Sequence, residues 1–161
     1  MAYDERHYII VPASLQAQAN AEAVKWDPDA GGGSTFNGAR LSDDGGATPT
    51  HYACSTLIDV DYIPPGQGGQ TALDVLDAFY ATGHYKGYRI QRPDGDRSAL
   101  LEGEVDVWRS AHLDDQGVPQ PAGWYSLGTG RLSDLALTDA GLVQYEEDEE
   151  VKDVAISHPS D

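Results

Sequence analysis

The stretch TALDVLDAFYATGHYKGYRIQR, residues 71–92, combines the signals of a helix, a helix end and a strand. Thr71 is a favourable N-cap residue, and Asp74 stands where a capping box places its acidic partner. Gly83 fits the left-handed residue that closes a helix. Asp77 lies outside the predicted apolar face. That face follows helical spacing and consists of Ala72, Leu73, Leu76, Phe79 and Tyr80.

A strand and a hairpin are expected directly after this helix. Tyr88 and Ile90 alternate with polar residues, which is the period of a half-buried strand. The sequence Pro-Asp-Gly-Asp at residues 93–96 has the composition of a turn. The two flanking segments, Gly87–Gln91 and Ala99–Arg109, are therefore predicted to pair as a hairpin.

The rest of the chain predicts an α+β pattern. Ser14 is expected to cap a second helix over Leu15–Trp26, and Arg131–Tyr145 fits a helix or a strand equally well. We expect a single α+β domain over residues 1–145, with a mixed or antiparallel sheet, two main helices and long loops rich in glycine and proline. Its further strands are predicted at His7–Val11, Ser34–Leu41, His51–Val60 and Trp124–Leu127.

An acidic extension is expected after this domain, at residues 146–161. It begins with the unbroken acidic run Glu146–Glu150 and continues with the apolar stretch Val151–Ile156. The apolar stretch is predicted to add a short strand. That strand would join either the sheet of its own chain or, as an exchanged arm, the sheet of a neighbouring subunit.

The net charge of the chain argues against some classes of binding partner. The chain has 10 basic and 27 acidic residues, a formal net charge of −17. Such a surface argues against direct binding of nucleic acid or of an anionic membrane. Few lysines accompany the acids, which is typical of proteins that work in concentrated salt, and equally of ordinary acidic proteins from GC-rich genomes. No run is apolar enough for a signal peptide or a membrane span, so folding in the cytoplasm is expected.

No motif identifies a reaction, a metal or a cofactor. The glycine-rich residues 66–71 precede a helix, but Gln70 occupies the place where a phosphate-binding loop carries lysine. The single cysteine, Cys54, is interpreted as a small buried residue in a strand. Paired aspartates that can serve as cation ligands, or simply as turn residues, are Asp27 with Asp29, Asp43 with Asp44, Asp94 with Asp96, and Asp114 with Asp115.

Two alternative functions have candidate residues. A small metal-dependent hydrolase would use His7 and His51, each at the start of a predicted strand, together with turn aspartates. A carbohydrate-binding module would use Trp108, Trp124 and Tyr125 as stacking surfaces. Trp108 falls on the charged face of its predicted strand, which indicates that part of that face is covered.

One part of the chain resembles a known group of proteins. The resemblance rests on YIIVPAS at residues 8–14, the alanine-rich helix, Asp27-Pro28-Asp29, Thr35-Phe36 and THYACST at residues 50–56. Over residues 7–58 the chain resembles small uncharacterised proteins encoded among the structural genes of tailed viruses of bacteria and archaea. The resemblance implies a protein of the virion and carries over no functional residues.

The leading expectation is therefore a non-enzymatic structural or interaction protein. The resemblance points to a minor virion component, such as a capsid, tail or decoration subunit, made in the host cytoplasm. Its expected partners are other protein subunits of an oligomeric assembly. The acidic balance would suit a virus of a marine or halophilic host.

Overall fold

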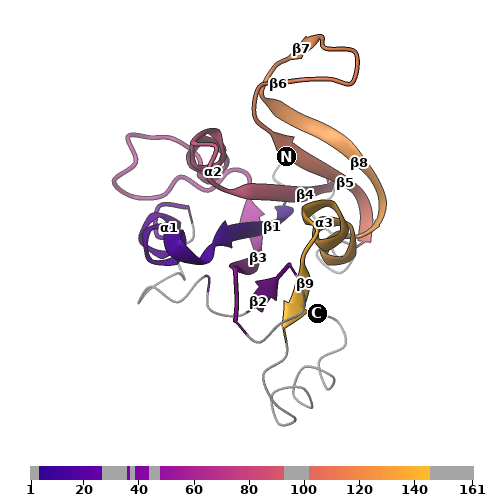
Figure 1. Cartoon of the computed structure of the whole chain (residues 1–161). Coiled ribbons are helices and arrows are strands. Elements are labelled where there is room, and N and C mark those ends of the chain that lie inside the picture. Colours follow the sequence, from indigo (N-terminus) through magenta and orange to yellow (C-terminus); the bar gives the residue numbers. More distant parts are fainter. Residues whose placement is uncertain (1–3, 27–35, 37–38, 44–47, 93–101, 146–161) are drawn as a thin grey trace.

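The computed structural model describes residues 4–26, 36, 39–43, 48–92 and 102–145 (Figure 1). Seven antiparallel strands form the main sheet, in the order β8-β5-β4-β1-β3-β2-β9. Together with the helices they confirm the predicted α+β domain. The strands are β1 Asp4–Pro12, β2 Ala39–Ser42, β3 His51–Asp59, β4 Lys86–Arg92, β5 Glu102–Arg109, β8 Gly123–Arg131 and β9 Val143–Tyr145.

Three helices cover the two faces of this sheet. Helices α1 (Gln16–Ala23) and α2 (Ala72–Ala81) lie on one face, which we call the α2 face. Helix α3 (Leu132–Ala140) lies on the other, the α3 face (Figure 1). Alternate residues of the central strand β1 enter the two cores, because successive side chains of a strand point to opposite faces. Ile9 and Val11 pack under α2, whereas Tyr8 and Ile10 pack under α3.

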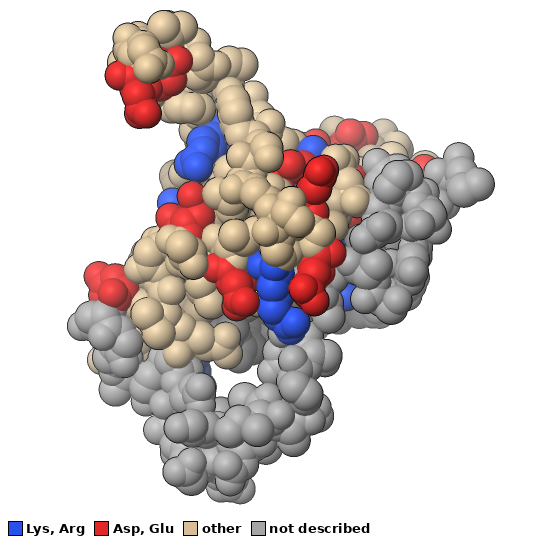
Figure 2. All heavy atoms as spheres, turned by 90° about the vertical axis from the view of Figure 1, so that its right-hand side faces the viewer, with Lys and Arg blue, Asp and Glu red and all other residues tan. Residues whose placement is uncertain are grey.

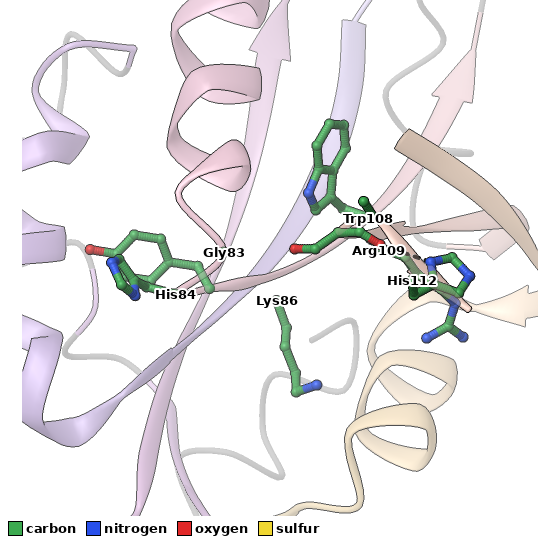
Figure 3. Close-up of a pocket in the computed structure, with 9 residues that line it drawn as sticks. Gly83, His84, Lys86, Trp108, Arg109 and His112 are labelled. Carbon is green, nitrogen blue, oxygen red and sulfur yellow. Dashed lines mark hydrogen bonds between the residues drawn. The ribbon is translucent and has the colours of Figure 1, made fainter. Parts of the chain in front are cut away.

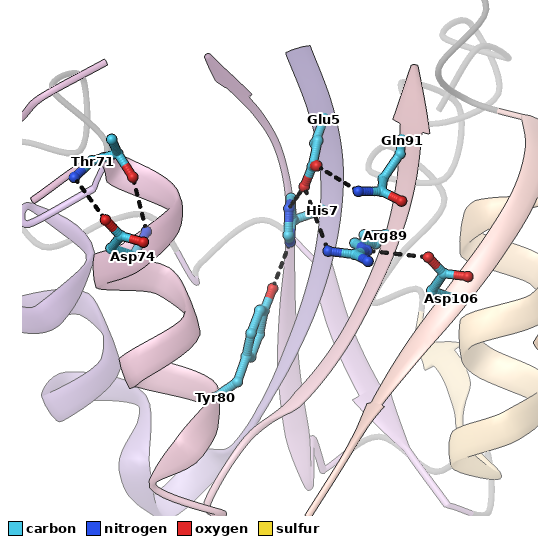
Figure 4. Close-up of polar contacts among 8 residues, drawn as sticks. All are labelled: Glu5, His7, Thr71, Asp74, Tyr80, Arg89, Gln91 and Asp106. Carbon is cyan, nitrogen blue, oxygen red and sulfur yellow. Dashed lines mark hydrogen bonds and ion pairs between the residues drawn. The ribbon is translucent and has the colours of Figure 1, made fainter. Parts of the chain in front are cut away.

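Helix α2 forms as its sequence predicts. Thr71 Oγ1 accepts from the backbone N–H of Asp74, and the Asp74 carboxylate accepts from the N–H of Thr71 (Figure 4). Gly83 has a φ of 82°, the left-handed conformation predicted for it. The buried side of the helix consists of Ala72, Val75, Leu76, Phe79 and Tyr80. It differs from the predicted face at two positions: Val75, which is not part of the predicted face, is buried, and Leu73 is only half-buried.

Asp77 lies outside the buried side of α2, as predicted, but it is not a fully exposed position. Its side chain is half-buried, because the helix turns this position toward His7 and Trp124 on the sheet. A helix has only one outward stripe when its neighbour is flat. Here Trp124 of β8 also contacts the side of α2, so Asp77 is partly enclosed.

Helix α1 is shorter than predicted and is not capped by Ser14. A 3-10 turn at Ala13–Leu15 precedes it, so Leu15 takes the N-cap position without a side-chain cap hydrogen bond. The alanine-rich stripe is confirmed, since Ala19, Ala23 and Trp26 are buried. The undecided stretch, residues 131–145, contains both α3 and β9.

The predicted hairpin is formed by β4 and β5, although residues 93–101 between them lie outside the described part. The two strands pair only from Tyr88 opposite Val107 to Ile90 opposite Val105. Beyond Val107, β5 stays with β8 up to Arg109 opposite Gly123 and diverges from β4. The result is a fork between β4 and β5, and the curled β5–β8 ribbon extends from it into a projecting arm (Figure 1).

This arm ends in a second, two-stranded sheet. Strands β6 (His112–Leu113) and β7 (Pro119–Gln120) pair antiparallel at its end. The extension predicted at residues 146–161 lies outside the described residues, so its docking in its own or a neighbouring sheet stays a prediction.

Candidate functional site

A buried polar network lies on the α2 face, where β1, β4 and β5 run side by side (Figure 4). The side chains of Glu5 and His7 are 1% and 0% exposed. His7 Nε2 lies 3.0 Å from Glu5 Oε1, and His7 Nδ1 lies 2.9 Å from the Tyr80 hydroxyl of α2. Gln91 Nε2 donates to the second Glu5 oxygen at 3.0 Å. The network therefore joins the helix to two strands.

The environment of His7 favours its neutral form. Burial lowers the pKa of His7 and the charge of Arg89 lowers it further, against the opposing effect of Glu5. A neutral ring closes the network: Tyr80 donates its O–H to Nδ1, and Nε2–H donates to Glu5. Burial alone would raise the pKa of Glu5. Hydrogen bonds from His7 and Gln91 and the charge of Arg89 outweigh it, so that pKa is lowered.

Arg89 extends the network toward the curled ribbon. Its Nε donates to Asp106 at 3.1 Å, and its guanidinium lies 4.0 Å from Glu5. The same group lies 4.2 Å from the centre of the Trp124 ring, a cation–π contact. Burial raises the pKa of Asp77 in spite of nearby His7 and Trp124. The network holds Tyr80 against β1, and the complete burial of His7 leaves no room for a substrate at that ring.

A pocket of about 420 Å³ occupies the fork between β4 and β5 (Figure 3). In the view of Figure 3, Trp108 borders it above, Lys86 below and His84 on the left, with Arg109 and His112 on the right. Arg109 Nη2 donates to Asp139 of α3 at 3.3 Å. The lining is rich in cationic and imidazole side chains. It consists of Gly83, His84, Tyr85, Lys86, Trp108, Arg109, Ser110, Ala111 and His112.

The β6–β7 arm, which projects from the body of the molecule with acidic side chains at its end (Figure 2), also carries exposed apolar side chains. Leu113 is 66% exposed and Val118 is 50% exposed. Between them, the Asp114 carboxylate accepts hydrogen bonds from the N–H groups of Gln116 and Val118 and from the side chain of Gln120. The bond from Val118 is the main cause of the lowered pKa of Asp114. The turn between the two apolar residues is therefore fixed by hydrogen bonds of its own.

The histidine pair predicted for a hydrolase is not formed. In the β1–β3 ladder, His7 stands opposite Thr56, and His51 stands opposite Pro12 at the other end. The expectation that two strand starts are neighbours fails because the strands are antiparallel. In the parts of the chain that the structure covers, no cluster of three or more histidine, cysteine or acidic residues can hold a metal ion.

The remaining sequence candidates also have local roles. Asp114 stabilises its turn, as described above. Asp43 is exposed, whereas its neighbour Asp44 and the aspartate pairs at residues 27–29 and 94–96 lie outside the described residues. At the glycine-rich loop, the N–H of Ala72 donates to the carbonyl oxygen of Tyr62, so capping and loop contacts already use the first amides of α2. Cys54 is half-buried against the α2 core.

The aromatic platform predicted for carbohydrate is divided between the two faces. Trp124 and Tyr125 are adjacent in β8 and point to opposite sides. Trp124 meets Trp108 on the α2 face, with ring centres 5.6 Å apart, whereas Tyr125 packs in the α3 core. The predicted cover over Trp108 is confirmed, because Tyr80 stacks on it at 6.0 Å.

Sequence reasoning did not find the network or the pocket. One signal for the network was present: Glu5 and His7 continue the face of β1 that carries Ile9 and Val11. Polar residues in register with a buried face need partners. No comparable signal marked the pocket, because it depends on where β4 and β5 separate.

The comparisons with known proteins add no assignment. No protein-family model, curated protein or solved structure matches the chain. None of the described helices is both long and apolar enough to cross a membrane.

Proposed function

We propose that this chain is a non-enzymatic structural or interaction protein that works within an assembly of protein subunits. The observation that supports this most is the β6–β7 arm, which presents Leu113 and Val118 to solvent on a turn fixed by Asp114. Exposed apolar residues on a projecting, ordered element are a costly arrangement for an isolated protein and a favourable one for a contact. The arm would insert these side chains into a neighbouring subunit.

The more specific form of this proposal is a minor virion component of a tailed virus, in its capsid, tail or decoration layer. It rests on the sequence resemblance over residues 7–58. The net charge of −17 opposes contact between like subunits, and concentrated salt screens that repulsion. Assembly and thermal stability should therefore both increase in molar potassium chloride. An unchanged or lower melting temperature there would contradict adaptation to salt.

Replacing the exposed apolar residues of the arm by aspartate tests whether the arm contacts a neighbouring subunit. The double variant Leu113→Asp, Val118→Asp should lower the average mass of the protein in molar potassium chloride, measured by light scattering, without changing its melting temperature. Val24→Asp is the control, since Val24 is 53% exposed at the C-cap of α1, away from the arm. Equal masses for the two variants would exclude the arm as the contact element. Detection of the chain in purified virus particles would test the specific form.

A further inference from the structure

The fork pocket differs in charge from the rest of the protein. The chain has 27 acidic and only 10 basic residues, yet Lys86, Arg109 and two imidazoles line the pocket, and none of the described residues that line it is acidic. In a molecule of net charge −17, a cavity with this lining is a local region of positive potential. Such a region attracts anions even when the whole molecule does not.

The two basic groups at the pocket differ in their ion pairs. None of the acids described in the structure forms an ion pair with Lys86. Its charge instead acts on another potential cation: burial lowers the pKa of His51, and Lys86 lowers it further. Arg109 does have a partner, but its single bond to Asp139 engages one of the five N–H donors of a guanidinium.

The other walls supply further donors and an aromatic surface. Ser110 has a hydroxyl and His84 has a ring N–H group. The ring of His112 already donates from Nδ1 to the carbonyl oxygen of Ser110 at 2.7 Å. The cationic groups of Lys86 and Arg109 and these donors match an oxygen-rich anion, and the rings of Trp108 and Tyr85 suit a planar or apolar body.

We propose that the fork pocket binds a small organic anion, a carboxylate or phosphate group attached to a ring. Lys86 and Arg109 hold the charged group, and Trp108 and Tyr85 contact the ring. The volume of about 420 Å³ lies within the usual range for small-molecule sites, roughly 300–1,000 Å³. This inference does not depend on the proposed assembly function, because Leu113 and Val118, on which that proposal rests, do not line the pocket, although His112 of β6 does.

Calorimetric titration of the full chain in low salt tests the site with four probes. Benzoate and phenyl phosphate represent the two anionic sources, inorganic phosphate lacks the ring, and benzyl alcohol lacks the charge. We expect one site per chain for benzoate or phenyl phosphate, weaker binding of inorganic phosphate and none of benzyl alcohol. Affinity should fall as salt is raised. The anion that binds more tightly shows whether the site prefers a carboxylate or a phosphate group.

Two matched variants locate the binding. Lys86→Met should weaken the better probe roughly five- to tenfold, the size of one lost charge-assisted contact. Lys25→Met makes the same substitution just after α1, where Lys25 pairs with Glu22, and should leave the affinity unchanged. Absence of binding by every anion, equal loss in both variants, or equal binding of benzyl alcohol would overturn the proposal. The arm variant Leu113→Asp, Val118→Asp should keep this affinity, so the two proposals fail separately.

Discussion

The two faces of the sheet share the same strands but bury different chemistry. On the α3 face, alternate residues of β1, β4 and β5 form an apolar core of Tyr8, Ile10, Tyr88, Ile90, Val105 and Val107. On the α2 face, the same strands place Ile9 and Val11 beside the fully enclosed Glu5 and His7. One face therefore depends on burial of apolar area, and the other also depends on a closed set of hydrogen bonds.

This difference indicates which part of the fold tolerates substitutions and which part requires particular residues in particular positions. An apolar core accepts changes that conserve volume, whereas a buried polar group is costly unless every partner is in position. The partners of Glu5 and His7 come from α2, in Tyr80, and from β4, in Gln91 and Arg89. The network can close only when the helix and both strands are correctly placed. We infer that the α2 face selects the arrangement of the elements, and the α3 face mainly adds stability.

The largest effect is expected at the centre of the apolar part of α2. Leu76 is 0% exposed, so Leu76→Ala should lower the free energy of unfolding by about 2–5 kcal/mol through lost burial and a residual cavity. Leu73→Ala, at a half-buried position of the same helix, should cost clearly less. Urea unfolding measures both. Equal midpoints would show that the buried face of α2 is wrongly assigned.

A smaller loss in the free energy of unfolding is expected where the ring of Tyr80 crosses β4. A methyl group on Gly87 would lie 2.3 Å from a ring carbon of Tyr80, too close for any Cβ. Gly87→Ala should therefore displace Tyr80 from His7 and cost about 3 kcal/mol, the upper end of typical overpacking. Gly130→Ala on β8 is the control, because its nearest side-chain atom would be 3.4 Å away, on Leu135. If both variants are equally stable, α2 does not pack this closely on the sheet.

The hydroxyl groups of two tyrosines, Tyr80 on the α2 face and Tyr88 on the α3 face, allow the stability of the two faces to be compared. Both rings are 0% exposed; the Tyr80 hydroxyl donates to buried His7, and the Tyr88 hydroxyl donates to Asp139 of α3 at 2.8 Å. Tyr80→Phe leaves a buried acceptor unpaired and should cost roughly 1–3 kcal/mol. Tyr88→Phe should cost about 1 kcal/mol or less, because Asp139 retains Arg109. The reverse order in thermal melts would contradict the proposed role of the network.

Much of the fold could be predicted because its signals are local. The capping box of α2, the left-handed Gly83 and the alternation along β4 each depend on residues a few positions apart. The failures depend on long-range geometry. Ser14 lost its predicted cap because a 3-10 turn moved the start of α1, and His7 and His51 separated because β1 and β3 run in opposite directions.

The sites were harder to predict for the same reason. Glu5 and Gln91 are 86 residues apart in the chain, and only the pairing of β1 with β4 makes them neighbours. The pocket requires the point at which β4 leaves β5, which no residue pattern encodes by itself. Adjacent aromatic residues were also misleading: Trp124 and Tyr125 were grouped by sequence, whereas the pleat of β8 sends them to different cores.

The last and smallest expected effect is a change in how steeply the free energy of unfolding depends on pH. It concerns the α2 face, which encloses His7. The pKa of His7 lies below its ordinary value of 6.5 because the ring is buried. Below about pH 6.5 the unfolded chain therefore binds a proton that the folded chain does not, and stability is lost as the pH falls through this range. The lowered pKa of Glu5 adds a loss of the same sign below about pH 4.5. The raised pKa of Asp77 opposes it.

His7→Gln isolates this contribution, because an amide can still accept from Tyr80 and donate to Glu5. Urea midpoints measured from pH 7.5 to pH 5 should fall less steeply for His7→Gln than for the native chain. A residual slope is expected from His51, whose pKa is also lowered by burial. His84→Gln, at an exposed position, should retain the native slope. A native slope in His7→Gln as well would mean that the ring is not buried in its neutral form, and that the α2 face is held together by an ion pair rather than by a neutral hydrogen-bond network.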